Sequence, residues 1–225
     1  MATHTQIIEF FGLPACGKST LCNAVIESTI SVSTIFCRMN EISSEYRKAN
    51  IIQKIRYFPY RASLLLLLLI IKSCPSRKNV RIYKSFLSIL MIYAFCKHTK
   101  KYDYMLIDHG VFQSVVSLFY GSSTSKFNSS VDIVNQLVTT IGIEYPIHCY
   151  ISVEESIRRM RKRNRVDSGR LDVIGDKKKL ETIMIVQSQQ FERLSDIRHI
   201  QKINMEKTIE HNVSDLFKQI KNEIG

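Results

Sequence analysis

The sequence has no tryptophan, only four prolines and eight glycines, and no apolar run as long as a membrane-spanning helix. Low proline and glycine content excludes collagen-like and low-complexity chains. Hydrophobic residues make up 45% of the chain and charged residues 23%, a balance that excludes a disordered chain. With 225 residues the chain is long enough for its own core, and we expect a single domain over residues 1–225.

Paired cysteine spacings are also missing, which argues against zinc and redox sites. The six cysteines are scattered and are interpreted as reduced thiols: Cys16, Cys22, Cys37, Cys74, Cys96 and Cys149. Residues 1–6 lack the basic and then apolar pattern of a signal peptide. Both observations predict a cytoplasmic protein.

Acidic residues are outnumbered, with 20 Asp and Glu against 32 Lys and Arg, so the formal net charge is +12. A positive field attracts anions, which include nucleic acids, acidic lipids and phosphorylated metabolites. A composition rich in Lys and Ile also arises from an AT-rich genome. The location of the charge must therefore identify the anion.

Two uncharged apolar stretches, residues 62–71 and 85–96, are the longest in the chain. A helix rises about 1.5 Å per residue, so neither stretch reaches across a bilayer core of roughly 30 Å. We expect these stretches to form a buried helical hairpin rather than to span a membrane.

Short apolar runs alternate with helical patterns along the chain. Strands are expected at residues 6–11, 30–36, 104–107, 146–153 and 199–204. Helices are expected at 19–29, several times within 40–101, and at 111–120, 131–142, 154 onward, 177–194 and 213–224, with a Ser-rich connection at 121–130. This alternation predicts an α/β fold with helices on both faces of a five-stranded parallel sheet, and ligands beyond the carboxyl ends of its strands.

Gly12 to Thr20, with the sequence GLPACGKST, matches the phosphate-loop (Walker A) pattern G-x-x-x-x-G-K-[ST] between a strand and a helix. Gly12 and Gly17 allow backbone N–H groups to point inward, and the helix N-terminus adds partial positive charge. Lys18 is predicted to reach the β- and γ-phosphates of ATP and Ser19 to hold Mg²⁺. Cys16 is interpreted as a small filler of the loop, although a thiol with a lowered pKa stays an alternative.

Asp108 follows the strand expected at 104–107, where a carboxylate can orient the water around Mg²⁺ or accept a proton from an acceptor hydroxyl. A helix N-cap is the alternative role for this residue. His109 and Gln113 follow at the same corner and are candidates for contact with the substrate, with a packed or surface role as the alternative.

Residues 158–170 read RRMRKRNRVDSGR and hold the densest positive charge in the chain. Arg159 and Arg163 are one helical turn apart, and Ser168 and Gly169 precede Arg170. Guanidinium groups on a mobile segment can close over a polyphosphate, so residues 158–173 are predicted to form a lid. A solvated basic helix and a nucleic-acid contact are the alternatives.

Together the phosphate loop, Asp108, the helix with Arg159 and Arg163, and residues 168–172 (SGRLD) resemble the P-loop nucleoside and nucleoside-monophosphate kinases, including thymidylate and adenylate kinases. The resemblance covers nearly the whole chain. It implies a three-layer P-loop fold with ATP on Gly12, Gly17, Lys18, Ser19 and Thr20, and transition-state arginines at Arg163 and Arg170. It also implies that Arg159 and Asn204 border the nucleotide.

The resemblance further implies that residues 38–101 form a helical region that binds the acceptor. The candidates there are Arg38, Glu41, Arg56 and Arg61. An acceptor that is itself a phosphate ester needs a bidentate arginine, whereas an uncharged acceptor does not. Asp108-His109-Gly110 lacks the Asp-Arg pair of thymidylate kinases and the Glu-Arg pair of deoxynucleoside kinases, which leaves the acceptor open.

These patterns predict an ATP- and Mg²⁺-dependent phosphotransferase whose acceptor is a nucleoside or nucleoside monophosphate, as in thymidylate kinases. A kinase of another hydroxyl compound is the first alternative. A non-catalytic nucleotide-binding module, attached to a membrane surface through its Leu-rich hairpin, is the second, and a nucleic-acid end kinase is the third. Neither nucleic acid nor a membrane is an expected partner, and a homodimer is left open.

Overall fold

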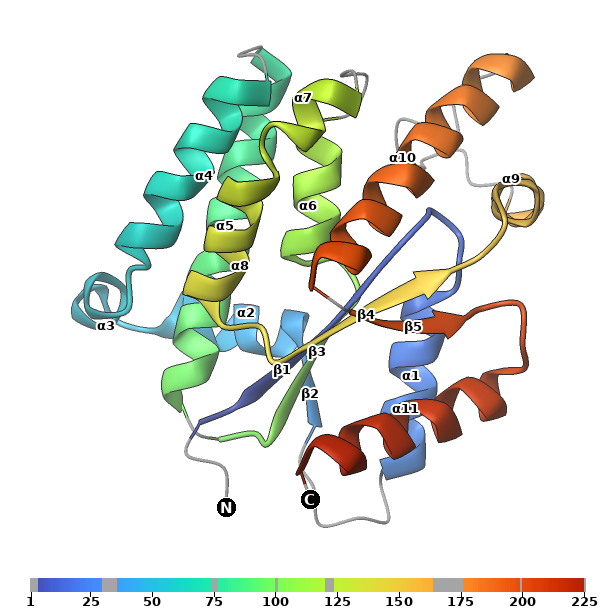
Figure 1. Ribbon diagram of the computed structural model, residues 1–225. Helices are drawn as coiled ribbons and strands as arrows, with labels where there is room; N and C mark the ends of the chain where they lie inside the picture. Colours follow the sequence, from blue (N-terminus) through green and yellow to red (C-terminus); the bar gives the residue numbers. More distant parts are fainter. Residues whose placement is uncertain are drawn as a thin grey trace.

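The computed structural model describes residues 4–29, 36–73, 77–99, 101–119, 124–163, 176–198 and 200–224. These residues form one five-stranded parallel sheet in the order β2-β3-β1-β4-β5 (Figure 1). The strands are β1 (Gln6–Phe11), β2 (Phe36–Arg38), β3 (Tyr104–Ile107), β4 (Tyr145–Tyr150) and β5 (Gln201–Asn204). Because all strands are parallel, their carboxyl ends lie along one edge of the sheet.

Helices cover both faces of the sheet, with α1 and α11 on one face and α5, α6, α8 and α10 on the other (Figure 1). The bounds of the helices between β1 and β3 are α1 (Lys18–Thr29), α2 (Met39–Lys48), α3 (Ile51–Arg56), α4 (Tyr60–Ser73) and α5 (Arg77–Thr99). The later helices are α6 (Val111–Leu118), α7 (Thr124–Asn128), α8 (Val131–Ile141), α9 (Val153–Lys162), α10 (Lys177–Arg198) and α11 (Ile209–Ile224). The three-layer α/β class is confirmed.

Strand β1 is the centre of the sheet, since β3 pairs with it on one side and β4 on the other. Its apolar residues Ile7, Ile8, Phe10 and Phe11 are fully buried. A parallel strand with helices on both faces needs apolar side chains in both directions, which explains an apolar run without alternation. The phosphate loop therefore follows a buried strand that is paired on both sides.

Two elements differ from the sequence expectations. The second strand, expected at residues 30–36, lies at Phe36–Arg38, and residues 30–35 are outside the described residues. Pairing with β3, in which Cys37 lies opposite Met105, sets the position of β2, and the β-branched residues before it do not. The Ser-rich connection at 121–130 contains α7, a short helix anchored by the buried Phe127.

The Leu-rich helix α4 is only half buried, so the expectation of a buried hairpin is wrong for this helix. Its residues Ala62, Leu66 and Leu69 are buried, and the helix packs against α5 and α8 on this side. The opposite side has no helix over it among the described residues, and it exposes Leu64, Leu67, Leu68 and Ile71. A run of six leucines does not mark which side is covered, so only the structure shows it. No helix of the described residues has the length and apolar character needed to span a membrane.

Candidate active site

The phosphate loop has the backbone that its glycines predict. Gly12, Ala15 and Gly17 have φ angles of 146°, 59° and 109°, in the region that side chains disfavour. A Cβ atom on Gly12 would lie 2.2 Å from the carbonyl oxygen of Cys149, so this position has room for glycine alone. Close contact with β4 and positive φ angles thus give the loop the backbone conformation expected of an anion-binding turn.

Lys18 begins α1 and its side chain is buried within the loop. Its Nζ donates hydrogen bonds to the carbonyl oxygens of Gly12, at 3.1 Å, and Leu13, at 3.0 Å. The Sγ atom of the buried Cys16 lies 3.5 Å from the same nitrogen. The lysine is therefore already positioned on the inner side of the loop.

Ser19 and Asp108 meet although 89 residues separate them in the sequence. Ser19 lies in the first turn of α1, and its Oγ donates a hydrogen bond of 2.5 Å to Oδ2 of Asp108, directly after β3. Thr20 follows with an exposed side chain. The parallel sheet brings this hydroxyl oxygen and this carboxylate oxygen together at the mouth of the phosphate loop.

A cavity of about 510 Å³ opens beside this pair. Its lining comes from the start of α1, the end of β2 and the start of α2, and consists of Ser19, Cys22, Asn23, Arg38, Met39, Asn40, Ser43, Leu106 and Asp108. Of the four acceptor candidates, the structure brings only Arg38 to this cavity. Glu41, Arg56 and Arg61 are exposed side chains of α2, α3 and α4 and do not line it.

His109 follows Asp108 at the same corner. Its side chain is exposed to solvent, although the surrounding protein partly desolvates the imidazole ring. This desolvation, and then the positive charge of Lys18, lower the pKa of His109, while Asp108 opposes the shift. A neutral imidazole at this corner can donate or accept a hydrogen bond without adding charge.

Gln113 lies behind the phosphate loop, where its buried Oε1 accepts a hydrogen bond of 3.4 Å from the backbone N–H of Gly12. The sequence analysis proposed this side chain as a contact of the substrate. The structure gives it a supporting contact with the loop, which ties α6 to the turn that follows β1.

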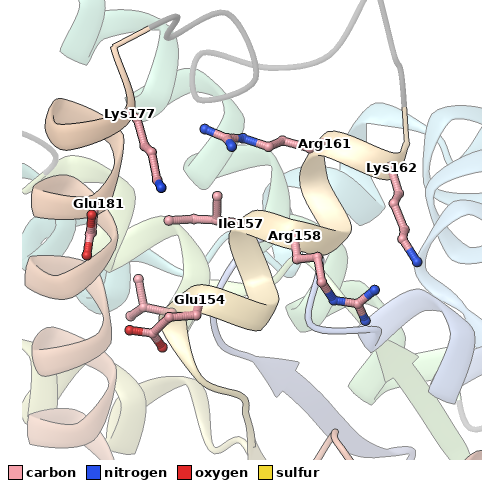
Figure 2. Close-up of a pocket in the computed structure, with 8 residues that line it drawn as sticks. Glu154, Ile157, Arg158, Arg161, Lys162, Lys177 and Glu181 are labelled. Atoms are coloured by element: carbon pink, nitrogen blue, oxygen red, sulfur yellow. The ribbon is translucent and has the colours of Figure 1, made fainter.

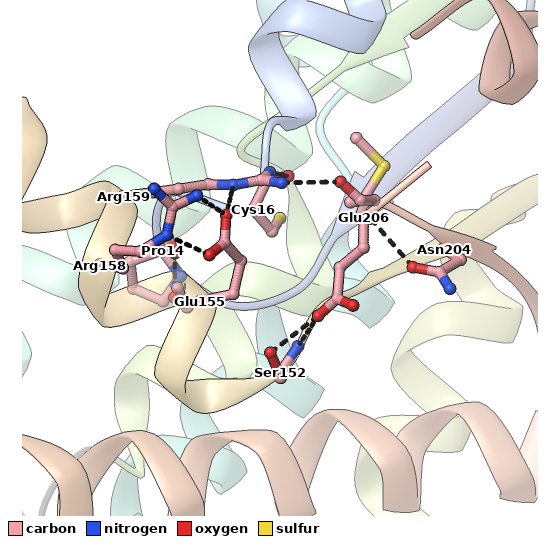
Figure 3. A network of polar contacts seen from close by, with 10 residues as sticks. Pro14, Cys16, Ser152, Glu155, Arg158, Arg159, Asn204 and Glu206 are labelled. Carbon is pink, nitrogen blue, oxygen red and sulfur yellow. Dashed lines mark hydrogen bonds and ion pairs between the residues drawn. The ribbon is translucent and has the colours of Figure 1, made fainter. Parts of the chain in front are cut away.

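Arg159 joins the predicted lid helix α9 to the phosphate loop (Figure 3). Its guanidinium group donates to the carbonyl oxygens of Cys16, at 3.2 Å, and Met205, at 3.1 Å, and pairs with Glu155 at 2.7 Å. The Oγ of Ser156 adds a hydrogen bond of 2.5 Å to the carbonyl oxygen of Pro14. Helix α9 is therefore fixed against the loop.

The remaining basic side chains of α9 border a second cavity, between α9 and α10. Arg158, Arg161 and Lys162 line a cavity of about 520 Å³ whose other wall includes Lys177 and Glu181 of α10 (Figure 2). Arg163 is the exposed C-cap residue of α9. Arg170 and residues 164–173 of the predicted lid lie outside the described residues.

The turn after β5 forms the other border of the loop. Asn204 Oδ1 accepts a hydrogen bond of 2.9 Å from the backbone N–H of Glu206, whose carboxylate accepts from the backbone N–H and Oγ of Ser152 (Figure 3). A cavity of about 460 Å³ lies between this turn and α9, lined by Ser152, Glu154, Glu155, Arg158, Arg159 and Glu206. Asn204 thus shapes the turn that borders this cavity.

Sequence reasoning missed one residue of the site, Glu9, which is fully buried in β1. Its carboxylate accepts hydrogen bonds from the backbone N–H of Phe112, at 2.6 Å, and from Tyr93 Oη, at 2.9 Å. Gly110, the N-cap residue of α6, offers no side chain, and a Cβ there would lie 2.3 Å from Glu9 Cδ. Glu9 therefore caps α6 from the neighbouring strand and positions the Asp108-His109-Gly110 corner. A lone carboxylate in an apolar central strand was the available signal.

Burial raises the pKa of Glu9 to about 7, against the opposing effect of its hydrogen bonds with Tyr93 and Phe112. An unfolded chain releases this proton near pH 4.5, so between pH 4.5 and 7 the folded state holds more protons than the unfolded state. The contribution of Glu9 to the free energy of unfolding is therefore fully present below pH 4.5 and is lost as the pH rises through 7.

We expect the replacement Glu9→Gln to reduce the pH dependence of stability. Between pH 5 and 8 the free energy of unfolding of the wild-type protein should fall by about 2 to 3 kcal/mol more than that of the variant. Urea denaturation at each pH measures this difference, with Glu27→Gln on the exposed side of α1 as the control. Parallel pH profiles for wild type and Glu9→Gln would contradict the assignment.

The site fits a magnesium nucleotide by the chemistry of its donors. A hydroxyl and a carboxylate oxygen suit Mg²⁺, which commonly takes few protein ligands and completes its shell with phosphate oxygens and water. Among the described residues no group of three or more His, Cys, Asp and Glu side chains could hold a metal ion by itself. Ser19 and Asp108 are therefore suited to a metal that arrives with a polyphosphate.

No protein-family model and no curated protein matches this chain. Solved structures with the same fold include three of deoxyadenosine kinase from M. mycoides, with products dCMP and a flexible dCDP, with dCTP and with dATP bound. They are 14% identical, with TM-scores of 0.54, 0.50 and 0.51 in that order. The matches cover 98%, 96% and 96% of this chain and 100%, 100% and 99% of those chains. The fold that the resemblance to P-loop nucleoside kinases implies is thus confirmed over nearly the whole chain.

Proposed function

We propose that this protein is an ATP- and Mg²⁺-dependent kinase that transfers the γ-phosphoryl group to a nucleoside or nucleoside monophosphate. The observation that carries the proposal is the contact between Ser19 and Asp108. The pair lies at the mouth of the phosphate loop and lines the same cavity as Arg38. The residues proposed to serve the donor, the metal and the acceptor therefore lie at one edge of the sheet. The deoxynucleotides in the similar structures support the same class of substrate.

Charge stabilisation in this proposal comes from groups that the fold holds in place. Backbone N–H groups of the loop and the N-terminus of α1 bind the donor phosphates. The ammonium group of Lys18 faces the loop interior, where it stabilises negative charge on the transferred group. Arg163 and Arg170 are proposed to add guanidinium groups from the lid.

Ser19 and Asp108 would hold Mg²⁺, and the metal, when bound, neutralises phosphate charge and orients the phosphates for in-line displacement. The hydroxyl and the carboxylate are already in contact, so little rearrangement is needed to present both oxygens. Asp108 also lines the acceptor cavity, where its carboxylate can take the proton from an acceptor hydroxyl.

Incubation of the protein with ATP, Mg²⁺ and a mixture of nucleosides, nucleoside monophosphates and other hydroxyl metabolites tests the proposal. We expect ADP and one class of phosphorylated nucleoside product in equal amounts, identified by mass. Phosphorylation of a non-nucleotide hydroxyl compound would establish the alternative kinase. Binding of ATP without transfer to any acceptor would establish a non-catalytic module and contradict the proposal.

Arg38 provides a test of whether the acceptor carries a phosphate. For a nucleoside monophosphate, we expect Arg38→Gln to lower kcat/KM by about 10- to 100-fold, because a charged hydrogen bond to the acceptor phosphate is lost. For the corresponding nucleoside the loss should be smaller than about threefold. Steady-state kinetics with both acceptors measure the split, and Arg47→Gln on the exposed side of α2 is the matched control. An equal loss for both acceptors would show that Arg38 does not recognise an acceptor phosphate.

A further inference from the structure

The buried side and the exposed side of helix α4 are both apolar. Its exposed residues Leu64, Leu67, Leu68 and Ile71 follow the i, i+3, i+4, i+7 spacing of one helix face. Leu64 and Ile71 are each 60% exposed. Single exposed leucines are ordinary on protein surfaces, whereas a continuous apolar stripe marks an interaction surface.

Helix α3 extends this surface at the same outer edge of the molecule (Figure 1). None of its residues is buried, and Ile51, Ile52 and Ile55 are 73%, 72% and 59% exposed. Lys54 is instead turned toward the protein, where its Nζ lies 5.3 Å from the centre of the Tyr46 ring and donates to the carbonyl oxygen of Arg47. The helix thus exposes its isoleucines and partly covers its lysine.

The two helices that form this apolar surface, α3 and α4, carry basic residues and no carboxylate. Residues 46–102 contain no Asp or Glu. They contain thirteen basic residues, of which Lys97 and Lys101 are paired with Glu144 and Glu45: Arg47, Lys48, Lys54, Arg56, Arg61, Lys72, Arg77, Lys78, Arg81, Lys84, Lys97, Lys100 and Lys101. Arg56 of α3 and Arg61 of α4 are exposed beside the isoleucines and leucines, and the neighbouring α8 contributes one carboxylate, Asp132.

We propose that the exposed apolar side of α3 and α4 binds the surface of an anionic phospholipid membrane. Leucine and isoleucine side chains would enter the boundary of the acyl chains while the arginines contact lipid phosphates. The length of the helices limits this contact to the surface. The proposal is independent of the kinase function and concerns the place where the protein works.

Charge decides between a membrane and a second copy of this chain as the occupant. In a two-fold dimer across α3 and α4, each basic border would face the same basic border of the partner. An anionic bilayer offers the opposite charge to the whole border and apolar volume to the stripe. The membrane therefore satisfies both features of this surface, whereas a dimer satisfies only one.

Co-sedimentation of the full chain with phosphatidylcholine vesicles, with and without phosphatidylglycerol, tests the proposal. We expect binding to the anionic vesicles that weakens at high salt. The triple variant L64S/L67S/I71S should lower the partition coefficient by at least about tenfold, because three partly inserted side chains are removed. The double variant R56Q/R61Q should lower it by about fivefold per residue on anionic vesicles only.

Ile185→Ser on α10 is the matched control, because Ile185 is also an exposed apolar side chain but lies on another helix. This control should retain vesicle binding, and all variants should keep the circular dichroism spectrum of the wild type. Absence of binding to both kinds of vesicle would overturn the proposal. A dimer in sedimentation velocity that L64S/L67S/I71S dissociates, without vesicle binding, would assign the surface to a second copy.

Discussion

Replacement of Lys18 by methionine is expected to lower kcat for phosphoryl transfer by about a thousandfold. Removal of one preorganised donor from a transition-state charge costs roughly a factor of 10² to 10³. The methionine keeps the length of the side chain but has no proton for the carbonyl oxygens of Gly12 and Leu13 or for phosphate. Single-turnover measurement of the product separates this loss from slow product release.

Lys179→Met is the matched control for Lys18→Met, since Lys179 is an exposed lysine in the first turn of α10. This control should retain wild-type turnover. Circular dichroism and thermal melting establish that Lys18→Met is folded. A folded Lys18→Met protein with turnover within tenfold of the wild type would contradict the role of this lysine.

Replacement of Asp108 by asparagine should lower kcat by about 10²- to 10³-fold, the usual scale for a residue that accepts a proton or places a metal. Asparagine has nearly the same shape and can still accept the hydrogen bond of Ser19 Oγ, so the fold should be unchanged. The loss of charge should also raise the Mg²⁺ concentration needed for half-maximal rate. Initial rates across a magnesium titration measure both effects.

The control for Asp108→Asn is Asp132→Asn, because Asp132 is an exposed carboxylate at the start of α8. Its rate and magnesium dependence should match those of the wild type. If Asp108→Asn lowers kcat but leaves the magnesium dependence unchanged, Asp108 acts on the acceptor proton rather than on the metal. Unchanged kcat would contradict both roles.

The fold could be predicted from the sequence because parallel strands with helices on both faces leave a strong pattern. Apolar runs such as Tyr104–Ile107 end directly before polar residues such as Asp108, and helices separate the runs. The position of β2 could not be predicted, because pairing with β3 sets it. Strand propensity is a weaker influence than pairing with a neighbouring strand.

The phosphate loop and the position of Asp108 could be predicted because their chemistry is local or lies at a strand end. The contacts that support them are not local. Gln113 reaches Gly12 across 101 residues, Arg159 reaches Cys16 across 143, and Glu9 reaches Phe112 across 103. Such contacts depend on how helices pack on the sheet, and no spacing in the sequence records them.

The exposed side of α4 shows a further limit of sequence reasoning. A run of leucines predicts an apolar helix, but it has no polar residues to mark a surface. The structure shows that α5 and α8 pack against one side of α4. The exposure of its side chains, rather than their hydrophobicity, therefore distinguishes α4 from a core helix.

The central claim is that the phosphate loop and the Ser19–Asp108 pair together bind a magnesium nucleotide. Calorimetric titration of the protein with ATP, in Mg²⁺ and then in EDTA, tests it most directly. We predict saturable binding of one ATP per chain that weakens at least about tenfold without Mg²⁺, since the metal links the phosphates to both oxygens. Absence of ATP binding in Mg²⁺ would contradict the account.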